Sequence, residues 1–341
     1  MKRPPTIVDI ARLAGVSKGA VSFALNGQPG VSKETRARIL TIAEELGWRP
    51  SSAARALKGA PVGAVGLVLK RAQPTKGISQ FHLDLISGIE AALADRSAAL
   101  VLQLVDDNKS EIEVVRRWWG DARVDGVIVT DLGVDDVRLP VLEELRMPAV
   151  VVGSPPGAVT LPAVWSDDAG AMEEAVQYLA ALGHRRIARV AGLMAFRHTE
   201  IRGEAFDRAC TELGLEGVAT LETNFTRTSG AAATRRLLSM PQRPTAIIYD
   251  NDVMAVEGVK VADEMGISVP DQLSIIGWDD SLLCQMARPA VTTMSRDIPA
   301  YGYRAAELLF ASLDGEPTAD LPAASTYQLT PRETTAVCRT G

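Results

Sequence analysis

Residues 7–26 constrain the fold of this chain more than any other stretch, because they fit two short helices joined by one tight turn. Thr6 is placed to cap the first helix, and Asp9 three residues later completes a capping box. Gly15 permits the turn, since a residue without a Cβ atom tolerates a positive φ, and Ser17 is placed to cap the second helix. Apolar residues at helical spacing give each helix one face for packing. These faces comprise Ile10, Leu13 and Ala14 in the first helix and Ala20, Val21, Ala24 and Leu25 in the second.

A third helix is predicted from Ser32, which caps it, to Gly47, which ends it. Its apolar positions are Ile39, Leu40, Ile42, Ala43 and Leu46. Two helices around a tight turn, supported by a third helix, form the helix-turn-helix motif, whose second helix enters the major groove of DNA. The N-terminal part of the chain therefore predicts a small all-α DNA-binding unit.

Charge is distributed unevenly along the chain, which has a net charge of −6 over its 341 residues. Residues 1–60 carry ten Lys and Arg against four Asp and Glu, whereas the remainder carries 26 against 38. A basic module attached to an acidic body indicates that only the first part binds a polyanion such as nucleic acid. The charge pattern thus agrees with the predicted DNA-binding motif.

Targeting signals and cysteines narrow the class of protein further. Residues 1–5 carry two charges with no apolar run behind them, so no signal peptide is predicted, and no stretch is apolar enough to span a membrane. The three cysteines, Cys210, Cys284 and Cys338, lack the spacing of metal or redox sites. We expect a cytoplasmic protein with reduced thiols, no bound metal and no cofactor.

From residue 62 onward, short apolar runs alternate with amphipathic segments. Residues 63–69 predict a buried strand, and residues 81–96 predict a helix whose apolar face includes Leu85 and Ile89. Further strands are predicted at residues 100–105, 124–130, 149–152, 187–191, 246–249 and 273–276. Strands that are buried on both faces and joined by helices indicate parallel sheets in a doubly wound α/β fold.

Three motifs together resemble the DNA-binding headpiece of the lactose-repressor (LacI/GalR) family. They are D-I-A-x-x-A-G-V-S-x-x-x-V-S from Asp9, V-S-x-x-T-R-x-x-I from Val31 and P-S-x-x-A-R-x-L from Pro50. The chain after residue 60 also resembles the sugar-binding core of this family, so the similarity covers nearly all 341 residues. The resemblance implies a ligand-regulated transcription factor and disfavours a three-helix bundle that has no DNA role.

The resemblance also implies how the domains are organised. The expected fold is an all-α helix-turn-helix headpiece with a hinge helix, followed by a two-lobed α/β core with parallel doubly wound sheets, like that of periplasmic binding proteins. The headpiece would occupy residues 1–50, the hinge helix and linker residues 51–60, and the effector-binding and dimerisation core residues 61–341. The N-lobe would comprise about residues 61–163 and 296–322, and the C-lobe about residues 164–295 and 323–341. The chain would cross between the lobes near residues 163–168, 292–298 and 322–326.

DNA contacts are implied for the recognition helix and for the hinge. Lys18, Gly19 and Ser22 would lie on the outer face of the second helix, where side chains reach phosphates and base edges. Phe23 stands where the family often has a polar or basic residue, so contact with a thymine methyl group and packing against the third helix both remain open. Leu57 matches a leucine that wedges apart the central base step in the minor groove. The complete set is Thr6, Ser17, Lys18, Gly19, Ser22, Phe23, Asn26, Ser32, Ser51, Ala54, Arg55, Leu57 and Lys58.

Effector contacts are implied for residues that match the family's binding cleft between the lobes. Arg202 matches a ligand-clamping arginine, Phe225 an aromatic residue that stacks on the effector, and Asp279 a carboxylate that bonds paired hydroxyl groups. Asn251 is preferred to Asp252, which we expect to cap the following helix. The complete set is Phe81, His82, Asp84, Arg202, Phe225, Asn251, Asp279 and Arg296. The implied effector is a carbohydrate, with a purine as the alternative, because related family members bind one in the same cleft.

The expected function is a transcriptional repressor that binds a partly palindromic operator as a homodimer and responds to a small effector. Effector binding would change the angle between the lobes and so order or melt the hinge helices. A solute-binding protein of the sugar-transport type is an alternative, which the basic headpiece and the absence of a predicted signal peptide oppose. A carbohydrate-active enzyme is a second alternative. No phosphate-loop, H-E-x-x-H or G-x-S-x-G motif supports it, and the sequence has only the histidines His82, His184 and His198.

Overall fold

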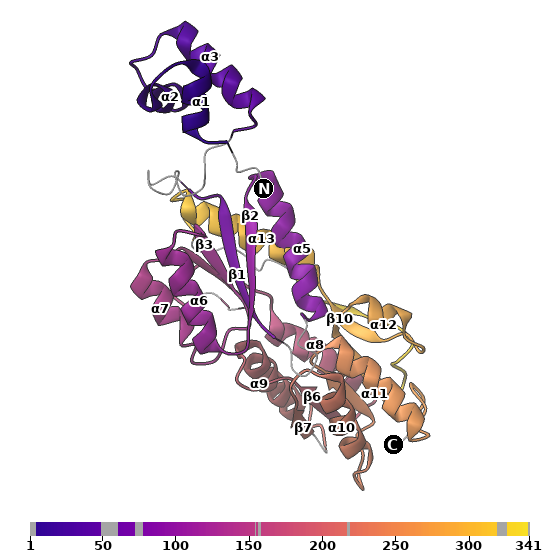
Figure 1. Cartoon of the computed structure of the whole chain (residues 1–341). Helices are drawn as coiled ribbons and strands as arrows, with labels where there is room; N and C mark the ends of the chain where they lie inside the picture. Colours follow the sequence, from indigo (N-terminus) through magenta and orange to yellow (C-terminus); the bar gives the residue numbers. More distant parts are fainter. Residues whose placement is uncertain are drawn as a thin grey trace. The chain divides into compact units, whose positions relative to one another are not determined.

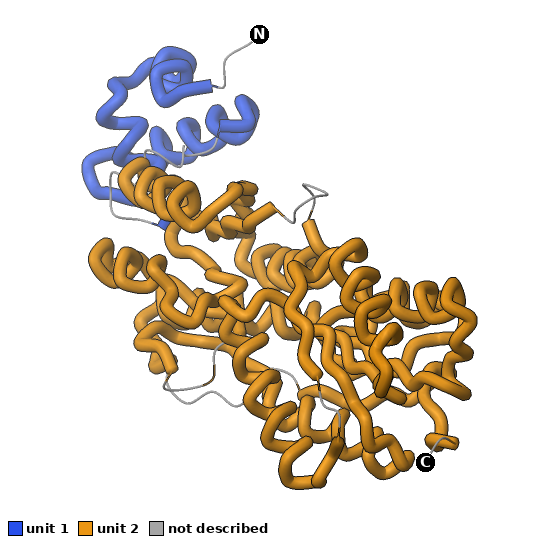
Figure 2. Tube along the Cα trace, turned by 90° about the horizontal axis from the view of Figure 1, so that it is seen from below, with its two compact units in different colours: residues 1–62 blue, residues 63–341 orange. Residues whose placement is uncertain are grey.

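The computed structural model describes residues 5–48, 61–71, 78–153, 155, 158–216, 219–318 and 326–339. The chain divides into two compact units, residues 1–62 and residues 63–341, which are coloured separately in Figure 2. The predicted hinge helix at residues 51–60 lies outside the described residues, as does most of the third predicted crossing at residues 322–326. Each unit is described below on its own.

Unit 1, residues 1–62, contains a bundle of three helices (Figure 1). The helices are α1 (Ile7–Ala14), α2 (Lys18–Leu25) and α3 (Lys33–Glu45). Gly15 has a φ of 68°, which allows the tight turn between α1 and α2 that its sequence position predicts. The buried core comprises Ile10, Ala11, Ala14, Val21, Ala24, Ile39 and Ala43. The helix-turn-helix predicted from the sequence is therefore confirmed.

Each helix of unit 1 begins at the predicted polar residue. Thr6 and Asp9 form a capping box at the start of α1, with 2.9 Å between the Thr6 backbone nitrogen and the Asp9 carboxylate. The Ser17 hydroxyl group accepts the backbone N–H of Ala20 at 3.1 Å, and Ser32 caps α3 in the same way. These caps satisfy backbone donors that have no partner within the helix, which explains why such short helices begin where they do.

Two leucines that we expected in the core of unit 1 are exposed instead. Leu13 in α1 is 57% exposed, and Leu40 in α3 is 46% exposed. The buried stripe of α1 runs along Ile10 and Ala14, and Leu13 lies just outside it. A small three-helix core covers only a narrow stripe of each helix, so apolar residues at its edge stay in solvent.

The first lobe of unit 2 is built on a parallel five-stranded sheet with the strand order β2-β1-β3-β4-β5. Its strands are β1 (Ala64–Lys70), β2 (Ala99–Val105), β3 (Gly126–Val129), β4 (Ala149–Val152) and β5 (Ala163–Val164). Its helices are α5 (Gln80–Asp95), α6 (Asn108–Gly120), α7 (Arg138–Leu145) and α13 (Ile298–Leu313). Figure 1 shows α5 and α13 on one side of this sheet and α6 and α7 on the other. The sheet is covered on both faces, as a doubly wound fold requires.

The second lobe is built on a six-stranded sheet with the order β11-β10-β9-β8-β6-β7, in which only the β10–β11 pair is antiparallel. Its strands are β6 (Ile187–Ala191), β7 (Ala219–Glu222), β8 (Ala246–Tyr249), β9 (Ser274–Asp279), β10 (Thr292–Ser295) and β11 (Gln328–Thr330). Its helices are α8 (Asp168–Ala181), α9 (Arg197–Glu212), α10 (Arg227–Leu238), α11 (Asp252–Glu264) and α12 (Leu282–Met286). The predicted two-lobed α/β core is confirmed.

The sequence pattern found β2 and most of the central strands but missed β5, β7, β10 and β11. Three of these lie at sheet edges: β5 in the first sheet, and β7 and β11 in the second. An edge strand packs less deeply, and β7 alternates half-buried with exposed residues. β10 is central and largely buried, but it consists of two threonines, a methionine and a serine, so it lacks the aliphatic run that marks the other central strands.

The chain leaves the first sheet after β5, enters the second lobe at α8, and returns after β10 into α13. Helix α13 belongs to the first lobe, because Tyr301, Ala305 and Leu309 pack in the same apolar core as Leu67 and Ile89. Two segments far apart in the sequence thus complete one lobe. The two described connections lie close together, since Arg296 Nη1 donates to the Ser166 hydroxyl oxygen at 3.3 Å.

Close contact between α5 and α13 depends on two glycines. A Cβ atom on Gly88 would collide with the Pro299 carbonyl group, and one on Gly302 would collide with the Leu85 carbonyl group. We predict that Gly302→Ala lowers the free energy of unfolding by about 1–3 kcal/mol, because the added methyl group forces the helices apart. Thermal denaturation measures the effect. Gly120→Ala in α6 is the control, since that position faces open space, and equal melting temperatures for the two variants would contradict the prediction.

Candidate functional site

The outer face of α2 is the candidate DNA interface of unit 1. Lys18 and Gly19 are exposed in its first turn, and Ser22 is half-buried one turn later. Asn26 caps the end of α2 and donates through its side-chain nitrogen to the Ser22 carbonyl group at 2.6 Å. Lys18 is the charged side chain of α2 and is therefore the one that this helix offers to a phosphate or a guanine.

Phe23 is neither fully packed against the protein nor fully exposed for contact with a thymine methyl group, the two alternatives that the sequence left open. Its side chain is 43% exposed, and a Cβ atom on Gly30 would lie 3.3 Å from its ring. The ring thus packs on the loop before α3 and keeps much of its surface in solvent. Its contact with DNA stays a prediction. Of the other candidates, Thr6, Ser17 and Ser32 cap the helices α1, α2 and α3. Ser51, Ala54, Arg55, Leu57 and Lys58 lie outside the described residues.

A cavity of about 530 Å³ lies between the two lobes of unit 2. Residues at or just after the carboxyl ends of parallel strands line it, among them Lys70, Asp131, Asn224, Asp279 and Arg296. This is where open α/β sheets bind ligands. All the predicted effector residues line it: Phe81, His82, Asp84, Arg202, Phe225, Asn251, Asp279 and Arg296.

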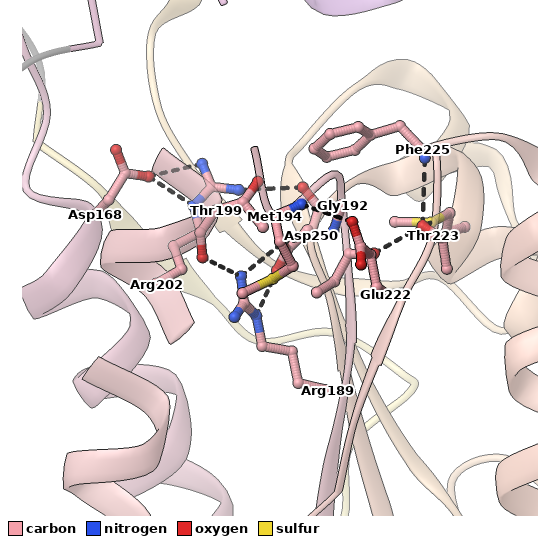
Figure 3. Close-up of polar contacts among 12 residues, drawn as sticks. Asp168, Arg189, Gly192, Met194, Thr199, Arg202, Glu222, Thr223, Phe225 and Asp250 are labelled. Atoms are coloured by element: carbon pink, nitrogen blue, oxygen red, sulfur yellow. Dashed lines mark hydrogen bonds and ion pairs between the residues drawn. The ribbon is translucent and has the colours of Figure 1, made fainter. Parts of the chain in front are cut away.

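Arg202 is held in the cavity wall by a buried ion pair with Asp168 (Figure 3). Its Nε and Nη2 atoms lie 2.7 and 2.6 Å from Asp168 Oδ1, and Nη1 donates to the Asp250 carbonyl group at 3.2 Å. The guanidinium carbon lies 4.2 Å from the centre of the Trp278 ring. Burial raises the pKa of Asp168 and the Arg202 charge lowers it, and the net pKa lies below its usual range. Asp168 is therefore ionised at neutral pH.

Arg296 forms the second ion pair of the cavity, with Asp279. Its Nε and Nη2 atoms lie 3.1 and 3.0 Å from Asp279 Oδ1. Three aromatic rings, those of Phe81, Tyr301 and Tyr327, lie 5.1, 5.2 and 4.9 Å from the guanidinium carbon. Such rings attract a cation electrostatically. The carboxylate of Asp279 thus neutralises the charge of Arg296, and the three rings help to fix the orientation of its guanidinium group.

His82 on α5 faces Asp131 after β3. The His82 Nε2 atom lies 3.2 Å from Asp131 Oδ2, and the Nδ1 atom lies 2.7 Å from the Ser79 hydroxyl oxygen. Burial lowers the pKa of His82 and the Asp131 charge raises it, with a net increase above 6.5. Beside this pair, the Asp84 carboxylate accepts a hydrogen bond from the Gln80 side chain at 2.9 Å. The first lobe therefore offers paired polar groups to the cavity.

Phe196, His198 and Phe225 form an aromatic wall on the second lobe. Their ring centres are 5.6 to 6.1 Å apart, and Phe196 and Phe225 are tilted by only 25°. Gly192 is required beneath this wall, because a Cβ atom there would collide with the Phe225 ring. Lys70 of the first lobe places its Nζ atom 5.1 Å from the Phe196 ring centre. The wall provides a flat apolar surface, which could stack on a ring.

Asn251, and not Asp252, caps α11, so our assignment of the cap was wrong. The Asn251 side-chain oxygen accepts the Met254 N–H at 2.9 Å, and its nitrogen donates to the Phe225 carbonyl group at 3.0 Å. Asn251 has the extended backbone that a capping residue needs, and the helix proper begins at Asp252. Asp252 instead accepts the Cys284 thiol at 3.0 Å, and burial raises its pKa to about 6. Both residues line the cavity.

Sequence reasoning missed several residues that line the cavity. Lys70 ends β1, Asp131 follows β3, and Asp168 begins the first helix after the crossing between lobes. Phe196 and His198 stand at the start of α9, after β6. The rule that selected Asp279, namely a polar residue at the carboxyl end of a parallel strand, would also have selected Lys70 and Asp131.

Backbone hydrogen bonds join the two lobes beside the cavity. The Val134 N–H donates to the Ala195 carbonyl group at 3.0 Å, and the Arg197 N–H donates to the Leu132 carbonyl group at 2.8 Å. These bonds connect the loop after β3 to the loop after β6. We call this connection the interlobe bridge. A change in the angle between the lobes would have to strain or break it.

The described part of the chain has neither a membrane-spanning helix nor a cluster suited to a metal ion. No helix there is long and apolar enough to cross a membrane. Within the same residues, no group of three or more His, Cys, Asp or Glu side chains is arranged to hold a metal ion. Cys210 and Cys284 are buried, and Cys338 is half-buried.

The two histidines that line the cavity, His82 and His198, should change the free energy of unfolding with pH in opposite directions. His82 has a raised pKa, so its contribution is present below about pH 6.5 and is lost as the pH rises through its folded-state value. Burial, then the Arg202 charge, lowers the pKa of His198 to about 4, so stability falls as the pH drops from about 6.5 towards that value. His82→Gln should flatten the first slope and His198→Gln the second, each by up to about 1.4 kcal/mol per pH unit. Thermal melts from pH 4 to 8 test this, and parallel profiles for both variants would refute it.

Comparisons with known proteins match this architecture. The family model described as bacterial regulatory proteins, lacI family, matches residues 6–51, and the periplasmic binding protein-like domain matches residues 176–335. The HTH-type transcriptional regulator CelR of Thermobifida fusca is 32% identical, covering 93% of this chain and 94% of CelR. A solved complex of transcriptional regulator CelR with cellobiose is 29% identical, with a TM-score of 0.72 over 97% of this chain and 99% of that one. The lac repressor dimer bound to operator and the anti-inducer ONPF is 23% identical, with a TM-score of 0.83 over 98% and 100% of the chains, and supports the fold alone.

A helix-turn-helix unit followed by a two-lobed core with a ligand-sized cavity defines a ligand-responsive, DNA-binding regulator. The chain belongs to the LacI family of bacterial transcriptional regulators. The family resemblance drawn from the three motifs is thereby confirmed. Relatives named as transcriptional regulators or repressors give no support to the transport-type or enzyme alternatives.

Proposed function

We propose that this regulator represses transcription as a homodimer on a partly palindromic operator and that a small neutral carbohydrate in the cavity controls its binding to DNA. The cavity between the lobes is the observation that carries this proposal, because every predicted effector residue lines it. Its volume of about 530 Å³ falls within the range of small-molecule sites. A two-fold symmetric dimer matches a two-fold symmetric operator.

The side chains of the cavity suit a sugar. Carboxylate, amide and guanidinium groups at Asp279, Asn251 and Arg202 provide hydrogen-bond partners for hydroxyl groups. The aromatic wall provides a surface for the C–H face of a sugar ring. CelR, one of the similar regulators, has been solved as a cellobiose complex, which supports the same ligand class here.

The charges of the cavity favour a neutral effector. Each arginine that lines it already faces an aspartate: Arg71 faces Asp106, Arg202 faces Asp168, and Arg296 faces Asp279. A phosphate or carboxylate would have to displace one of these aspartates or stand beside it, at a cost in repulsion. Hydroxyl groups can bond to the pairs without breaking them. A purine is the second candidate, since the nearly parallel Phe196 and Phe225 rings also suit a flat base.

For the DNA side, we infer that α2 enters the major groove and that the hinge helices enter the minor groove. Lys18, Gly19, Ser22 and Phe23 would face the major groove, and Leu57 would wedge the central base step. The effector would act by changing the angle between the lobes, which the interlobe bridge restrains.

A thermal-shift screen of the full chain, followed by gel-shift assays, tests the proposal. The panel contains cellobiose, glucose, galactose and maltose, their phosphorylated or uronate counterparts, and the bases adenine, guanine and hypoxanthine. We expect a neutral saccharide to raise the melting temperature and to change the gel shift of an operator fragment. A response to bases alone would favour the purine candidate. A response to anionic sugars alone would overturn the argument from charge.

A further inference from the structure

A fully buried ion pair lies behind the second-lobe wall of the cavity (Figure 3). Arg189 on β6 and Asp250 after β8 both have side chains with 0% exposure. The pair is bidentate, with distances of 2.9 Å from Nε to Oδ1 and 2.6 Å from Nη2 to Oδ2. Neither residue is among those that line the cavity. A buried pair of this kind is weak evidence for added stability, because desolvation offsets much of the attraction, so another role has to be considered.

The ion pair is connected directly to the arginine of the proposed effector site. The backbone carbonyl group of Asp250 accepts Arg202 Nη1 at 3.2 Å. Arg189 Nη2 donates to the Thr199 carbonyl group at 3.0 Å, in the first turn of α9, the helix that carries Arg202. The pair therefore holds both the guanidinium group of Arg202 and the helix from which it projects.

The same ion pair also holds the loop that joins the two lobes. Asp250 Oδ2 accepts the Gly192 N–H at 3.0 Å, where the chain leaves β6. The loop that begins at Gly192 supplies Ala195 to the interlobe bridge, and it leads into Arg197, the first residue of α9, which supplies the second bond. Gly192 also lies against the Phe225 ring of the aromatic wall. One carboxylate thus fixes a loop that reaches the first lobe and supports the wall.

We propose that Arg189 and Asp250 are positioning residues of the effector site. Their ion pair sets the direction of Arg202 and, through Gly192, sets the loop that forms the interlobe bridge. Effector recognition and the contact between the lobes then depend on one buried ion pair, although neither of its residues lines the cavity. This inference rests on the proposed effector site at Arg202. The inference goes beyond the proposed site because it assigns the link between effector recognition and the interlobe bridge to the ion pair of Arg189 and Asp250.

The test removes both charges together, so that no unpaired charge is left buried. The double variant Arg189→Met with Asp250→Ala is compared with Leu237→Val, a variant of a fully buried residue in α10 that perturbs the same lobe without touching the pair. A third variant, Arg189→Gln with Asp250→Asn, keeps hydrogen-bonding groups at both positions. All three are made in the full chain, and their melting curves report whether each is folded.

The first readout is hydrogen exchange without any saccharide. In the double variant Arg189→Met with Asp250→Ala, called the Met/Ala variant, we expect faster exchange of the backbone amides of residues 192–198. We also expect faster exchange of the backbone amides of residues 131–135 across the interlobe bridge, and neither change in Leu237→Val. The Gln/Asn variant should restore part of the protection. Unchanged exchange at residues 131–135 in the folded Met/Ala variant would overturn the proposal. An ion pair with only a local structural role would change the exchange rates of residues near β6 and not those across the interlobe bridge.

The second readout is calorimetric titration with cellobiose and with each other saccharide of the panel to which the wild-type chain responds. We expect affinity to fall by about tenfold in the Met/Ala variant, the effect of losing one well-placed bond to a charged group. Affinity equal to that of Leu237→Val would count against the positioning role. If the wild-type chain binds no saccharide, the proposed effector class fails, while the exchange experiment still decides on the ion pair.

Discussion

Replacement of Arg202 with methionine should abolish the thermal shift and the change in DNA binding caused by any saccharide that acts on the wild-type chain. Arg202 donates to Asp168 and to the Asp250 carbonyl group, so its guanidinium group is held ready in the cavity wall. Its loss also leaves Asp168 as a buried carboxylate without its ion-pair partner. We therefore expect the free energy of unfolding to fall by about 3–5 kcal/mol. Calorimetric titration and thermal denaturation measure the two effects separately.

A double variant separates binding from folding in this experiment. Arg202→Met combined with Asp168→Asn removes the unpaired charge, so most of the lost stability should return. Saccharide affinity should not return, because the donors of Arg202 are still missing. Near-native affinity in the double variant would mean that Arg202 only neutralises Asp168 and is not an effector contact.

Removal of residues 1–60 should eliminate operator binding while leaving a folded core that still binds saccharide. Among the described residues, each unit has an apolar core of its own, which includes Ile10 and Ala43 in unit 1 and Val65 and Leu67 in unit 2. The removed part also carries an excess of basic residues, ten Lys and Arg against four Asp and Glu. Gel shift, thermal denaturation and calorimetry of the truncated chain check the three expectations. Sedimentation adds the oligomeric state, which the proposed dimerisation through the core requires to be a dimer.

A point variant of the recognition helix gives the matched control for this truncation. Lys18→Ala changes one exposed side chain of α2 and should leave the melting temperature unchanged. Operator affinity should fall, and the salt dependence should lose about one phosphate contact if Lys18 bonds to the backbone. Unaltered operator affinity would place Lys18 outside the interface. A truncated core that aggregates would show instead that unit 2 needs the headpiece to fold.

The helix-turn-helix could be predicted because local rules decide it. Thr6, Asp9, Ser17 and Ser32 cap helices that begin within a residue or two of them, and Gly15 supplies the left-handed turn between α1 and α2. These interactions span three or four positions and are visible in the sequence. Central strands such as β4 and β8 could be predicted for a related reason, since burial on both faces favours an unbroken apolar run.

The candidate effector residues were found through family resemblance together with the rule that ligands bind at strand ends. Asp279 is an example, because it ends β9 and lines the cavity. The rule could not say which partner each residue has. Asp279 faces Arg296, 17 positions away, and Arg202 faces Asp168, 34 positions away. Such pairings depend on how strands and helices from different parts of the chain are brought together.

The sequence by itself determined the two units, the element types of the central fold and the residues that could form an effector site. The tertiary structure alone decided that Leu13 stays exposed, that the Asn251 side-chain nitrogen donates to the Phe225 carbonyl group, and that Arg189 and Asp250 meet behind the cavity. The physical reason is the distance along the chain over which each kind of interaction acts. Capping and strand burial are set by neighbours within a few residues, whereas a buried ion pair between β6 and the end of β8 exists only once those strands lie side by side in the sheet.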